Sequence, residues 1–340
     1  MNISDPPIAS DPLSSNATLP PDRAIGALWR RVAAFAIDGI VLCLLGLAIS
    51  LPFFETFSRI GVWGPLVGFC LALPYFAILN SGIGNGQTLG KRVVHIQVTD
   101  QYGNTISFWR SVARYVVFAI PYFLDEVSLP VTRTPWAVSI MISVIALGIG
   151  GATLYLVVFN GHSRQGIHDL IARSYVADAD KDGALDIKPT WGGHWVILGS
   201  GLIALFLGTG VLGNKIAQRG PFPQLLEDVR LVEGMEGVQS AGVQDMTTSS
   251  SGSEERQKIL VVNVNWAGKS ADKQAFADQV AKIIIEHDPS VKEHDQLKIT
   301  LIRGYFLGIA HAQASYYYEH TPAEWNARLF GTEGSAPAKP

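Results

Sequence analysis

Charged residues are scarce in this chain. Only 16% of its 340 residues are Asp, Glu, Lys or Arg, whereas about 25% is usual for soluble domains. The net charge of −3 gives no general attraction to phosphate backbones, so a nucleic-acid-binding protein is not expected. The mean hydropathy is positive, at +0.23. These deficits predict a membrane protein.

Cysteine is nearly absent. Cys43 and Cys70 both lie in apolar runs, where cysteine behaves as a small hydrophobic residue, so a disulfide framework and a cysteine-based zinc site are not expected. The histidines of the C-terminal part lack the H-x-x-x-H and HExxH spacings of metal sites. No Ser/His/Asp or Cys/His set can be proposed. We therefore expect no cofactor and no enzyme activity.

A phosphate-binding loop is missing too, although Gly90-Lys91 suggests one. That motif requires G-x-x-x-x-G-K-[ST] after a strand and at the start of a helix. Here Asn85 stands five positions before Gly90, and Arg92 follows Lys91. The expected strand, 93–99, comes after the glycines and not before them. Nucleotide binding is therefore not predicted.

Long apolar runs are what the chain does contain. Four of them can cross a hydrocarbon core of roughly 30 Å as helices, and they cover 32–54, 62–80, 136–159 and 193–213. A fifth run, 115–124, is short for a span and is compatible with an interfacial helix. Extended back to Phe108, it can cross if Arg114 reaches towards the headgroups.

Basic residues form three groups along the chain. They precede the first run, follow the second and follow the third: Arg23, Arg30 and Arg31; Lys91, Arg92, Arg110 and Arg114; Arg164, Arg173, Lys181 and Lys188. The positive-inside rule places all three groups in the cytoplasm only if 115–124 crosses. We therefore expect five spans in the plasma (inner) membrane, with the N-terminus cytoplasmic and the C-terminus outside.

The C-terminal part has the pattern of a soluble domain. Strands are expected at 238–246, 259–264, 297–303 and 309–318, with a helix capped by Ser270 between the second and third. The fold class is therefore an α-helical integral membrane protein followed by a small soluble α+β domain. The expected organisation is a disordered tail 1–26, a membrane domain 27–177, an acidic linker 178–190, an added span 191–213, an extracytoplasmic domain 214–330 and a tail 331–340.

Three stretches resemble a known family. They are WRRVAAFAIDGIVL, GQTLGKRVVHIQVTDQYGNTISFWRSVARY and RQGIHDLIARSYV. The first places Arg31 seven residues before an intramembrane Asp38, and the third supplies Asp169. Together they resemble the RDD family of multi-spanning membrane proteins over residues 27–177. The resemblance implies three signature charges, Arg31, Asp38 and Asp169, and the supporting motif residues Gly86, Gln87, Thr88, Gly90, Lys91, Arg92 and Arg164.

Asp38 has two readings. A charged Asp at the centre of a spanning helix costs roughly 2.5–3.5 kcal/mol on insertion scales, so it needs a compensating partner. Arg31 is far along the helix axis, and a partner from another helix, Arg110 or Arg114, is as suitable. Asp38 is then either a polar clamp that fixes helix packing or an ion or proton site. Asp169 could join two cytoplasmic segments through a salt bridge.

The acidic linker matches part of a calcium loop. Asp178, Asp180, Asp182 and Asp186 stand at ligand positions. The twelfth position is Pro189 where a bidentate Glu is required, and no outgoing soluble helix follows. A solvated linker without metal is therefore favoured over a calcium site.

The resemblance suggests transport of a small ion or solute, of the cation/proton exchange type. The alternative is a non-transporting anchor, assembly or sensor protein whose outer domain binds a partner. The expected partners are the lipid bilayer and a protein for the C-terminal domain, with a homo-oligomer left open. The two functions differ in whether polar groups face one another at membrane depth.

Overall fold

The computed structural model describes residues 23–125, 130, 134–249, 256–268 and 272–331. Most of the predicted tails, 1–22 and 332–340, lie outside these residues. Within the first predicted tail, Arg23 and Ile25 form isolated bridges to Leu185 and Ala177. The last few residues of that segment therefore pack on the folded chain.

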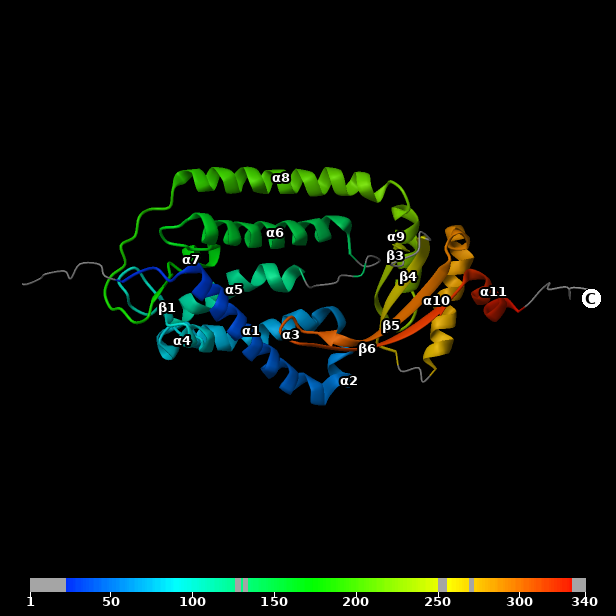
Figure 1. Ribbon diagram of the computed structural model, residues 1–340, viewed down its shortest axis with the longest axis horizontal. Helices are drawn as coiled ribbons and strands as arrows, with labels where there is room; N and C mark the ends of the chain where they lie inside the picture. Colours follow the sequence, from blue (N-terminus) through cyan, green and yellow to red (C-terminus); the bar gives the residue numbers. More distant parts are fainter. Residues whose placement is uncertain (1–22, 126–129, 131–133, 250–255, 269–271, 332–340) are drawn as a thin grey trace, which may run out of the picture.

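The membrane part is a bundle of long helices (Figure 1). Its members are α1 (Leu28–Ser50), α3 (Gly64–Leu79), α5 (Phe108–Asp125), α6 (Trp136–Phe159) and α8 (Gly192–Ala217). The short elements η1 (Leu51–Phe53), α2 (Phe54–Phe57) and η2 (Gly61–Trp63) connect α1 to α3. All five long helices run roughly along the long axis of the molecule, with α1 inclined to the others.

Four helical stretches are long and apolar enough to cross a membrane among the described residues: Leu28–Phe57, Gly61–Leu79, Trp136–Phe159 and Gly192–Val211. They correspond to the four long apolar runs of the sequence. The helix α5, which carries Arg110, Arg114 and Asp125, is not among them. It nevertheless packs against both α3 and α6 within the bundle. The expected fifth crossing stays a prediction.

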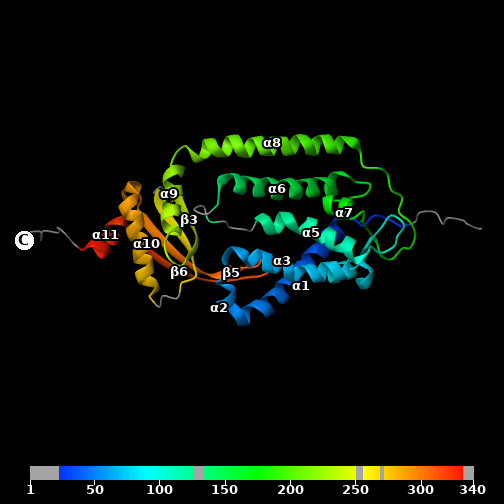
Figure 2. The ribbon, with the colours of Figure 1, turned by 180° about the vertical axis from the view of Figure 1, so that it is seen from behind.

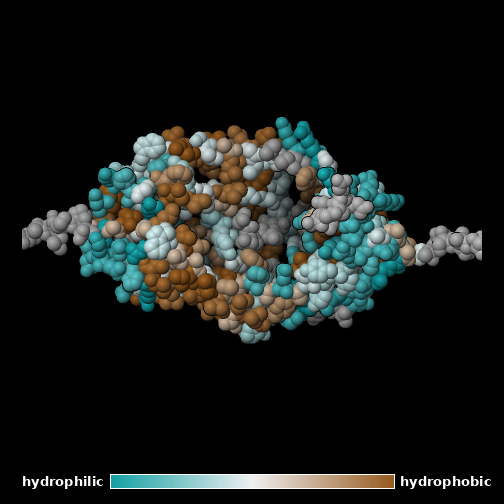
Figure 3. Space-filling view, in the orientation of Figure 1, coloured by the Kyte–Doolittle hydropathy of each residue, from teal (hydrophilic) through white to brown (hydrophobic). Residues whose placement is uncertain are grey.

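Apolar side chains cover the outside of this bundle. Large ones on α1, such as Phe35, Ile40 and Leu44, are more than half exposed. Figure 3 shows hydrophobic residues gathered over the middle of the molecule, with hydrophilic residues at both ends. A soluble protein rarely exposes an apolar surface of this extent. The band is what a helical membrane protein presents to lipid.

One end of the bundle carries the sequence motifs, and we call it the motif end. It contains η3 (Gly82–Gly84), α4 (Leu89–Val93), β1 (Ile96–Thr99), α7 (Ile167–Ile171) and β2 (Tyr175–Asp178). The strands β1 and β2 pair antiparallel, with Ile96 opposite Asp178. Ile96, Val98 and Val176 of this sheet pack with Ala34 of α1. Two motif segments far apart in the sequence thus form one small unit on the end of α1.

The C-terminal domain lies at the opposite end (Figures 1 and 2). It contains α9 (Phe222–Glu233), β3 (Val238–Ser249), β4 (Arg256–Trp266), α10 (Lys273–His287), η4 (Pro289–Glu293), β5 (Gln296–Phe306), β6 (His311–His320) and α11 (Pro322–Phe330). Its sheet has the order β3-β4-β5-β6. Only the β4–β5 pair is parallel, and α10 makes that crossover. The predicted α+β class is confirmed.

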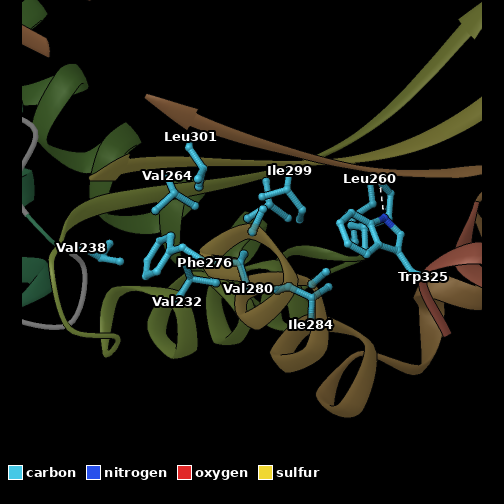
Figure 4. Packing of buried hydrophobic residues seen from close by; sticks show 14 of the residues in the cluster. Val232, Val238, Leu260, Val264, Phe276, Val280, Ile284, Ile299, Leu301 and Trp325 are labelled. Atoms are coloured by element: carbon cyan, nitrogen blue, oxygen red, sulfur yellow. Dashed lines mark hydrogen bonds between the residues drawn. The ribbon is translucent and has the colours of Figure 1, made fainter. Parts of the chain in front are cut away.

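The domain has a hydrophobic core of its own (Figure 4). Alternate residues of the central strands point to one face, and α10 covers that face with side chains one helical turn apart: Leu260, Val262, Val264, Leu297, Ile299 and Leu301 on the strands, and Phe276, Val280 and Ile284 on the helix. Trp325 of α11 closes the core and donates its indole N–H to the Leu297 carbonyl, at 3.0 Å.

The helix α10 begins differently from the prediction. Its N-cap is Asp272, whose side chain accepts a hydrogen bond from the Ala275 N–H, and the predicted cap, Ser270, lies outside the described residues. Asp is as good an N-cap as Ser. The helical spacing of the apolar residues predicted this helix correctly. It does not distinguish between two capping residues that stand close together in the sequence.

The hairpin of β5 and β6 extends out of the domain and into the helical bundle. Its tip, residues 306–311, turns at Gly308, which has a φ of +79°. A glycine with positive φ is what a two-residue hairpin turn requires at its first central position. Leu307 and Ala310 are buried, and Ala310 lies against Gly46 of α1. The sequence pattern predicted the hairpin but not its insertion between membrane helices.

Candidate functional site

The helix α1 buries one stripe of residues along its length. The buried positions recur every four residues: Ala34, Asp38, Leu42, Gly46 and Ser50. This spacing places them on a single face. Asp38 is the one acidic residue of the stripe and lies in its half nearest the motif end. Because its side chain is only 1% exposed, it must find its hydrogen-bond donors within the protein.

Three donors surround the carboxyl group of Asp38. The Tyr75 hydroxyl donates to Oδ1 at 2.7 Å, and the Gly90 backbone N–H donates to the same oxygen at 2.8 Å. The Thr88 hydroxyl donates to Oδ2 at 2.6 Å. Since all three partners donate, the group acts purely as an acceptor, which is the role of a carboxylate. Asp38 thereby fixes α3 and α4 against α1.

Gly90 can occupy its place only because it has no side chain. A Cβ there would lie 2.1 Å from the Ala34 carbonyl oxygen and 2.9 Å from Asp38 Oδ1. The backbone of α4 is therefore in direct contact with α1. Thr88 is the N-cap of α4, and its hydroxyl accepts a hydrogen bond from the Lys91 N–H. The Gly-Gln-Thr-x-Gly-Lys motif thus builds a short helix whose first turn receives the Asp38 carboxylate.

Lys91 lies beside this carboxylate and is buried. Its ammonium group donates to the Thr88 hydroxyl at 3.3 Å, and that hydroxyl donates in turn to Asp38. Burial, together with the positive charge of Arg114, lowers the pKa of Lys91 to about 7, although Asp38 acts in the opposite direction. The residue therefore changes its protonation near neutral pH. Thr88 links a titrating amine to an intramembrane carboxylate.

The second signature acid, Asp169, has charged partners. It lies on α7, is 1% exposed, and accepts from Arg114 Nε at 2.7 Å and from the Ser174 hydroxyl at 3.1 Å. Burial alone would raise the pKa of Asp169, but Arg114, His168 and Arg31 outweigh it and bring it well below its usual range. Asp169 is therefore a stable anion that holds α7 to α5.

The neighbouring His168 is neutral at pH 7. Burial lowers its pKa to about 4, against the influence of Asp169. Its Nε2 lies 3.3 Å from Asp169 Oδ2, and its ring packs edge-on against Phe118. Since His168 contributes no charge near neutral pH, the net charge at this site depends on the arginines, the two acids and Lys91.

Arg31 contacts backbone carbonyls and not a carboxylate. Its guanidinium donates to the carbonyl oxygens of Gly26 at 3.3 Å, Arg164 at 2.5 Å and Val176 at 3.0 Å. Those carbonyls belong to the segment before α1, the loop before α7 and β2. Arg31 therefore ties the two motif segments to the start of α1, while keeping its charge near Asp169.

The signature charges meet around one cavity. Its volume is about 430 Å³, and it lies between α1, α5 and α6 at the motif end of the bundle. The polar groups on its wall are Arg31, Asp38, Asn80, Lys91, Arg114, Thr153, His168 and Asp169. Apolar side chains such as Phe35, Phe118 and Leu154 form most of the remaining wall. A cavity of this size can hold a hydrated ion or a small solute.

The other motif residues shape the loop beneath this cavity. Gly86 has a φ of +66°, and Gln87 donates its side-chain N–H to the Ile96 carbonyl at 3.1 Å. Arg92 donates to the Gly84 carbonyl at 3.5 Å. Arg164 has a φ of +49° and contributes its carbonyl oxygen to Arg31. These four residues support the site without facing the cavity.

The expected partner of Asp38 needs correction. Arg114 bonds Asp169 instead, and Arg110 donates to the carbonyls of Ala172 and Arg173 at the end of α7. Within the part of the chain that the structure describes, no arginine or lysine nitrogen lies within ion-pair distance of Asp38. Neutral donors from α3 and α4 satisfy it, because α4 packs directly on α1.

The calcium alternative is not supported. Asp178 pairs with Arg30 at 3.2 Å, and Asp180 lies 3.0 Å from His95 Nδ1. Asp182 and Asp186 are exposed. Across the described ranges no group of three or more acidic, histidine or cysteine residues is placed to hold a metal. The sequence also lacks the twelfth ligand of a calcium loop, because Pro189 stands at that position.

Sequence reasoning missed two contributors. Tyr75 was treated as part of an apolar span, although it supplies a hydrogen bond to Asp38. A lone hydroxyl inside such a run is a usable signal, because a polar group in hydrocarbon needs a partner. Ser174 was also missed, and its signal is weaker because it stands in a polar loop next to several candidates.

The comparisons with known proteins agree with the motifs. Residues 25–173 match the family model described as the RDD family. No curated protein and no solved structure matches the chain. The matched region covers α1 to α7 and ends before β2, α8 and the C-terminal domain. Every residue that bonds Asp38 lies inside it.

Proposed function

The chain belongs to the RDD family through residues 25–173, and from that premise we propose that it exchanges a small cation for a proton across the membrane. The observation that carries the proposal is the cavity of about 430 Å³. It is lined by the intramembrane Asp38, by Asp169 of α7 and by Lys91, whose pKa is lowered to about 7. Intramembrane ionisable groups that line a cavity commonly mark ion or proton paths.

The proposed proton site is the chain of groups from Lys91 through Thr88 to Asp38. Without a cation, protonated Lys91 donates to the Thr88 oxygen and Thr88 donates to the Asp38 carboxylate. When a cation binds at that carboxylate, Lys91 gives its proton to water in the cavity and becomes a neutral amine. A cation bound beside Asp38 would repel the charged ammonium group and lower the pKa of Lys91 further. Binding of the cation and release of the proton are therefore coupled.

The remaining charges have a different task. Arg114 neutralises Asp169, and Arg31 donates to three carbonyl oxygens. Neither set of hydrogen bonds needs to change during exchange. They keep α7 and β2 fixed against α1 and α5. Asp38, whose partners are neutral, is left as the carboxylate that can take up a cation.

The test uses the full-length chain in liposomes that contain a pH-sensitive dye. An imposed sodium or potassium gradient should drive a dye response for the wild type. Asp38→Asn and Lys91→Met should reduce the response to that of protein-free liposomes. Asp186→Asn, at an exposed position of the linker, is the matched control and should exchange normally.

The rival function is a non-transporting anchor that serves a partner of the outer domain. Its support is that every donor around Asp38 comes from the protein, as expected for a clamp. If the well-folded wild type moves neither cation under any gradient, and Asp38→Asn lowers only its stability, the anchor replaces the transporter.

We further propose that the motif end is cytoplasmic and the C-terminal domain extracytoplasmic, in the plasma (inner) membrane. Support comes from the basic residues, which gather at the motif end, and from α5, which runs beside α3 and α6 between the two ends. Protease added to intact spheroplasts should then remove the C-terminal domain. Cleavage only in inverted vesicles would reverse this orientation.

A further inference from the structure

We propose that the hairpin tip, residues 306–311, is a removable plug that closes the domain-side end of the charged cavity. The inference rests on the proposed function for its purpose, but its geometry stands on separate contacts. The tip belongs to the C-terminal domain, outside the family region. It gives that domain a defined role, which is to control access to the cavity from its own side of the membrane.

The tip sits directly on the backbone of α3. A Cβ at Gly64 would lie 2.2 Å from the Phe306 carbonyl oxygen, and one at Gly68 would lie 1.6 Å from that of Leu307. The two glycines are one helical turn apart, so they form a flat strip on which the turn rests. Small residues allow this kind of close approach inside a membrane bundle.

Two other helices complete the niche. On α1, Gly46 faces Ala310, and Ser50 shares a hydrogen bond of 2.6 Å with the Tyr305 hydroxyl. On α5, the Tyr122 hydroxyl donates to the Gly308 carbonyl at 2.6 Å. Irregular backbone at membrane depth is tolerated where protein surrounds it and satisfies its polar groups. The tip meets both conditions.

The niche adjoins the cavity. Tyr122, which donates a hydrogen bond to the tip, also lines the cavity. So does Tyr115, two helical turns earlier on α5. Between the polar groups and the tip lies an apolar layer that contains Leu42, Ala72, Tyr115 and Ala119. Ile309 of the tip packs against that layer. The hairpin therefore supplies part of the seal between the cavity and the domain side.

The hairpin also has room and a weak point for withdrawal. A second cavity, of about 150 Å³, lies between its base, the sheet and the start of α3, with Gly61, Gln239 and Gln313 on its wall. Gly304 lies inside β5 opposite Gln313 of β6, and a glycine within a strand weakens it. Movement at Gly304 into this space would lift the tip from α3.

The experiment measures access to the cavity rather than transport alone. In full-length protein with Cys43 and Cys70 replaced by Ala, Thr153→Cys on the cavity wall reports labelling by a membrane-impermeant thiol reagent. The reagent is added from the domain side of oriented vesicles, and Lys292→Cys on the domain surface verifies the orientation. Labelling of residue 153 is read by mass spectrometry.

Two changes move the plug in opposite directions. Gly68→Ala should dislodge the tip and increase the labelling rate about fivefold or more, whereas Gly151→Ala, where an added Cβ meets nothing within 4 Å, should leave it unchanged. Gly46→Cys with Ala310→Cys should lock the tip once oxidised. A Cβ at residue 46 would lie 2.8 Å from that of Ala310, so a shift of about 1 Å brings the pair to the separation of roughly 3.5–4.5 Å that a disulfide requires. Oxidation should abolish labelling and reduction should restore it.

The outcomes separate this proposal from the exchange proposal. Labelling that follows the plug, in protein that moves no cation, would leave the plug standing and reject exchange. If Gly68→Ala labels like Gly151→Ala, or the locked and reduced forms label equally, the tip is a fixed anchor and the plug is rejected. Should Gly68→Ala not fold, Tyr122→Phe, which removes the hydroxyl group that bonds the Gly308 carbonyl, provides the loosened form.

Discussion

The two ends of the helical bundle are held together by different physical means. At the motif end, buried carboxyl groups collect donors from several segments, so Asp38 joins α1, α3 and α4 while Asp169 joins α5 and α7. At the domain end, two glycines of α3 contact the backbone of a β-hairpin, and a glycine of α1 contacts its side chains. The first kind of contact is costly to break. Among the described residues the tip, 306–311, makes no ion pair of its own, and the pair between Arg303 and Glu55 of α2 lies further along β5.

This difference tells which end can move. Removing one member of a buried charged set leaves the other in low dielectric at a cost of several kcal/mol. Lifting the apolar tip breaks the Tyr122–Gly308 hydrogen bond and, at its base, the Ser50–Tyr305 hydrogen bond. This costs less, because these polar groups can bind water outside. We therefore assign the fixed, binding role to the motif end and the moving role to the domain end.

The largest effect is expected from Asp169→Ala. It would leave Arg114 and Arg31 without their buried anion, which costs about 3–5 kcal/mol. The detergent-solubilised protein should show a large fall in folded yield and melting temperature. Asp186→Ala, an exposed acid on the linker, should change neither. Equal stability of both variants would mean that Asp169 does not hold the motif end together.

A smaller but still large effect is expected at the domain end. Gly68→Ala places a methyl group where the Leu307 carbonyl lies, and overpacking of this kind costs about 1–3 kcal/mol. Limited proteolysis should cut the hairpin faster in this variant than in Gly151→Ala. If the two variants are cut at the same rate, the hairpin does not rest on α3 in the way described.

The C-terminal domain should respond to pH through Asp228. Burial, and next the neighbouring carboxyl of Asp288, raise the pKa of Asp228 to about 7. Since the unfolded chain loses this proton near pH 4, stability should fall as pH rises from about 4 to about 7. Asp228→Asn should remove that fall and gain roughly 1–3 kcal/mol at about pH 7.5.

The measurement is the melting temperature of the domain at several pH values. Glu236→Gln, at an exposed position shortly after the same helix, should keep the wild-type pH dependence. A wild-type domain whose stability rises between pH 4 and 7 would show that the two acids do not repel each other when buried.

The smallest effect is expected from a substitution in the hairpin tip when the C-terminal domain is studied alone. The core of Figure 4 does not include the tip, so a fragment of residues 222–331 should fold alone. Ile309→Ser in that fragment should shift its stability by no more than about 0.5 kcal/mol, as a surface substitution does. The same change should destabilise the full-length chain more. Equal effects would mean that the tip supports the domain itself.

Much of this architecture could be predicted from periodicity. Apolar runs identified the four long helices, because a lipid-facing helix must be apolar all along its length. Alternation identified β4, β5 and β6, because one face of the sheet is buried. Short elements such as α4 and α7 could not be predicted in this way, since each depends on one capping residue and on packing against α1.

The candidate site was only partly predictable. Arg31, Asp38 and Asp169 were found through the family motifs, but their partners depend on how α4 lies on α1. The close approach of Gly90 gives Asp38 a backbone donor and leaves Arg114 to Asp169. The insertion of the hairpin was missed, because an apolar tip that contains a glycine has the sequence of an ordinary buried turn. Only its contact with the glycines of α3 shows where it lies.

The central claim is that cation binding at Asp38 is coupled to proton release through Thr88 and Lys91. The direct test is to add sodium or potassium to the weakly buffered, detergent-solubilised full-length protein at about pH 7 and follow a pH dye. The account predicts proton release in the wild type and in Thr88→Ser, and little or none in Thr88→Val, Lys91→Met and Asp38→Asn. A wild-type protein that releases no proton with either cation, or a Lys91→Met variant that releases as many as the wild type, would contradict it.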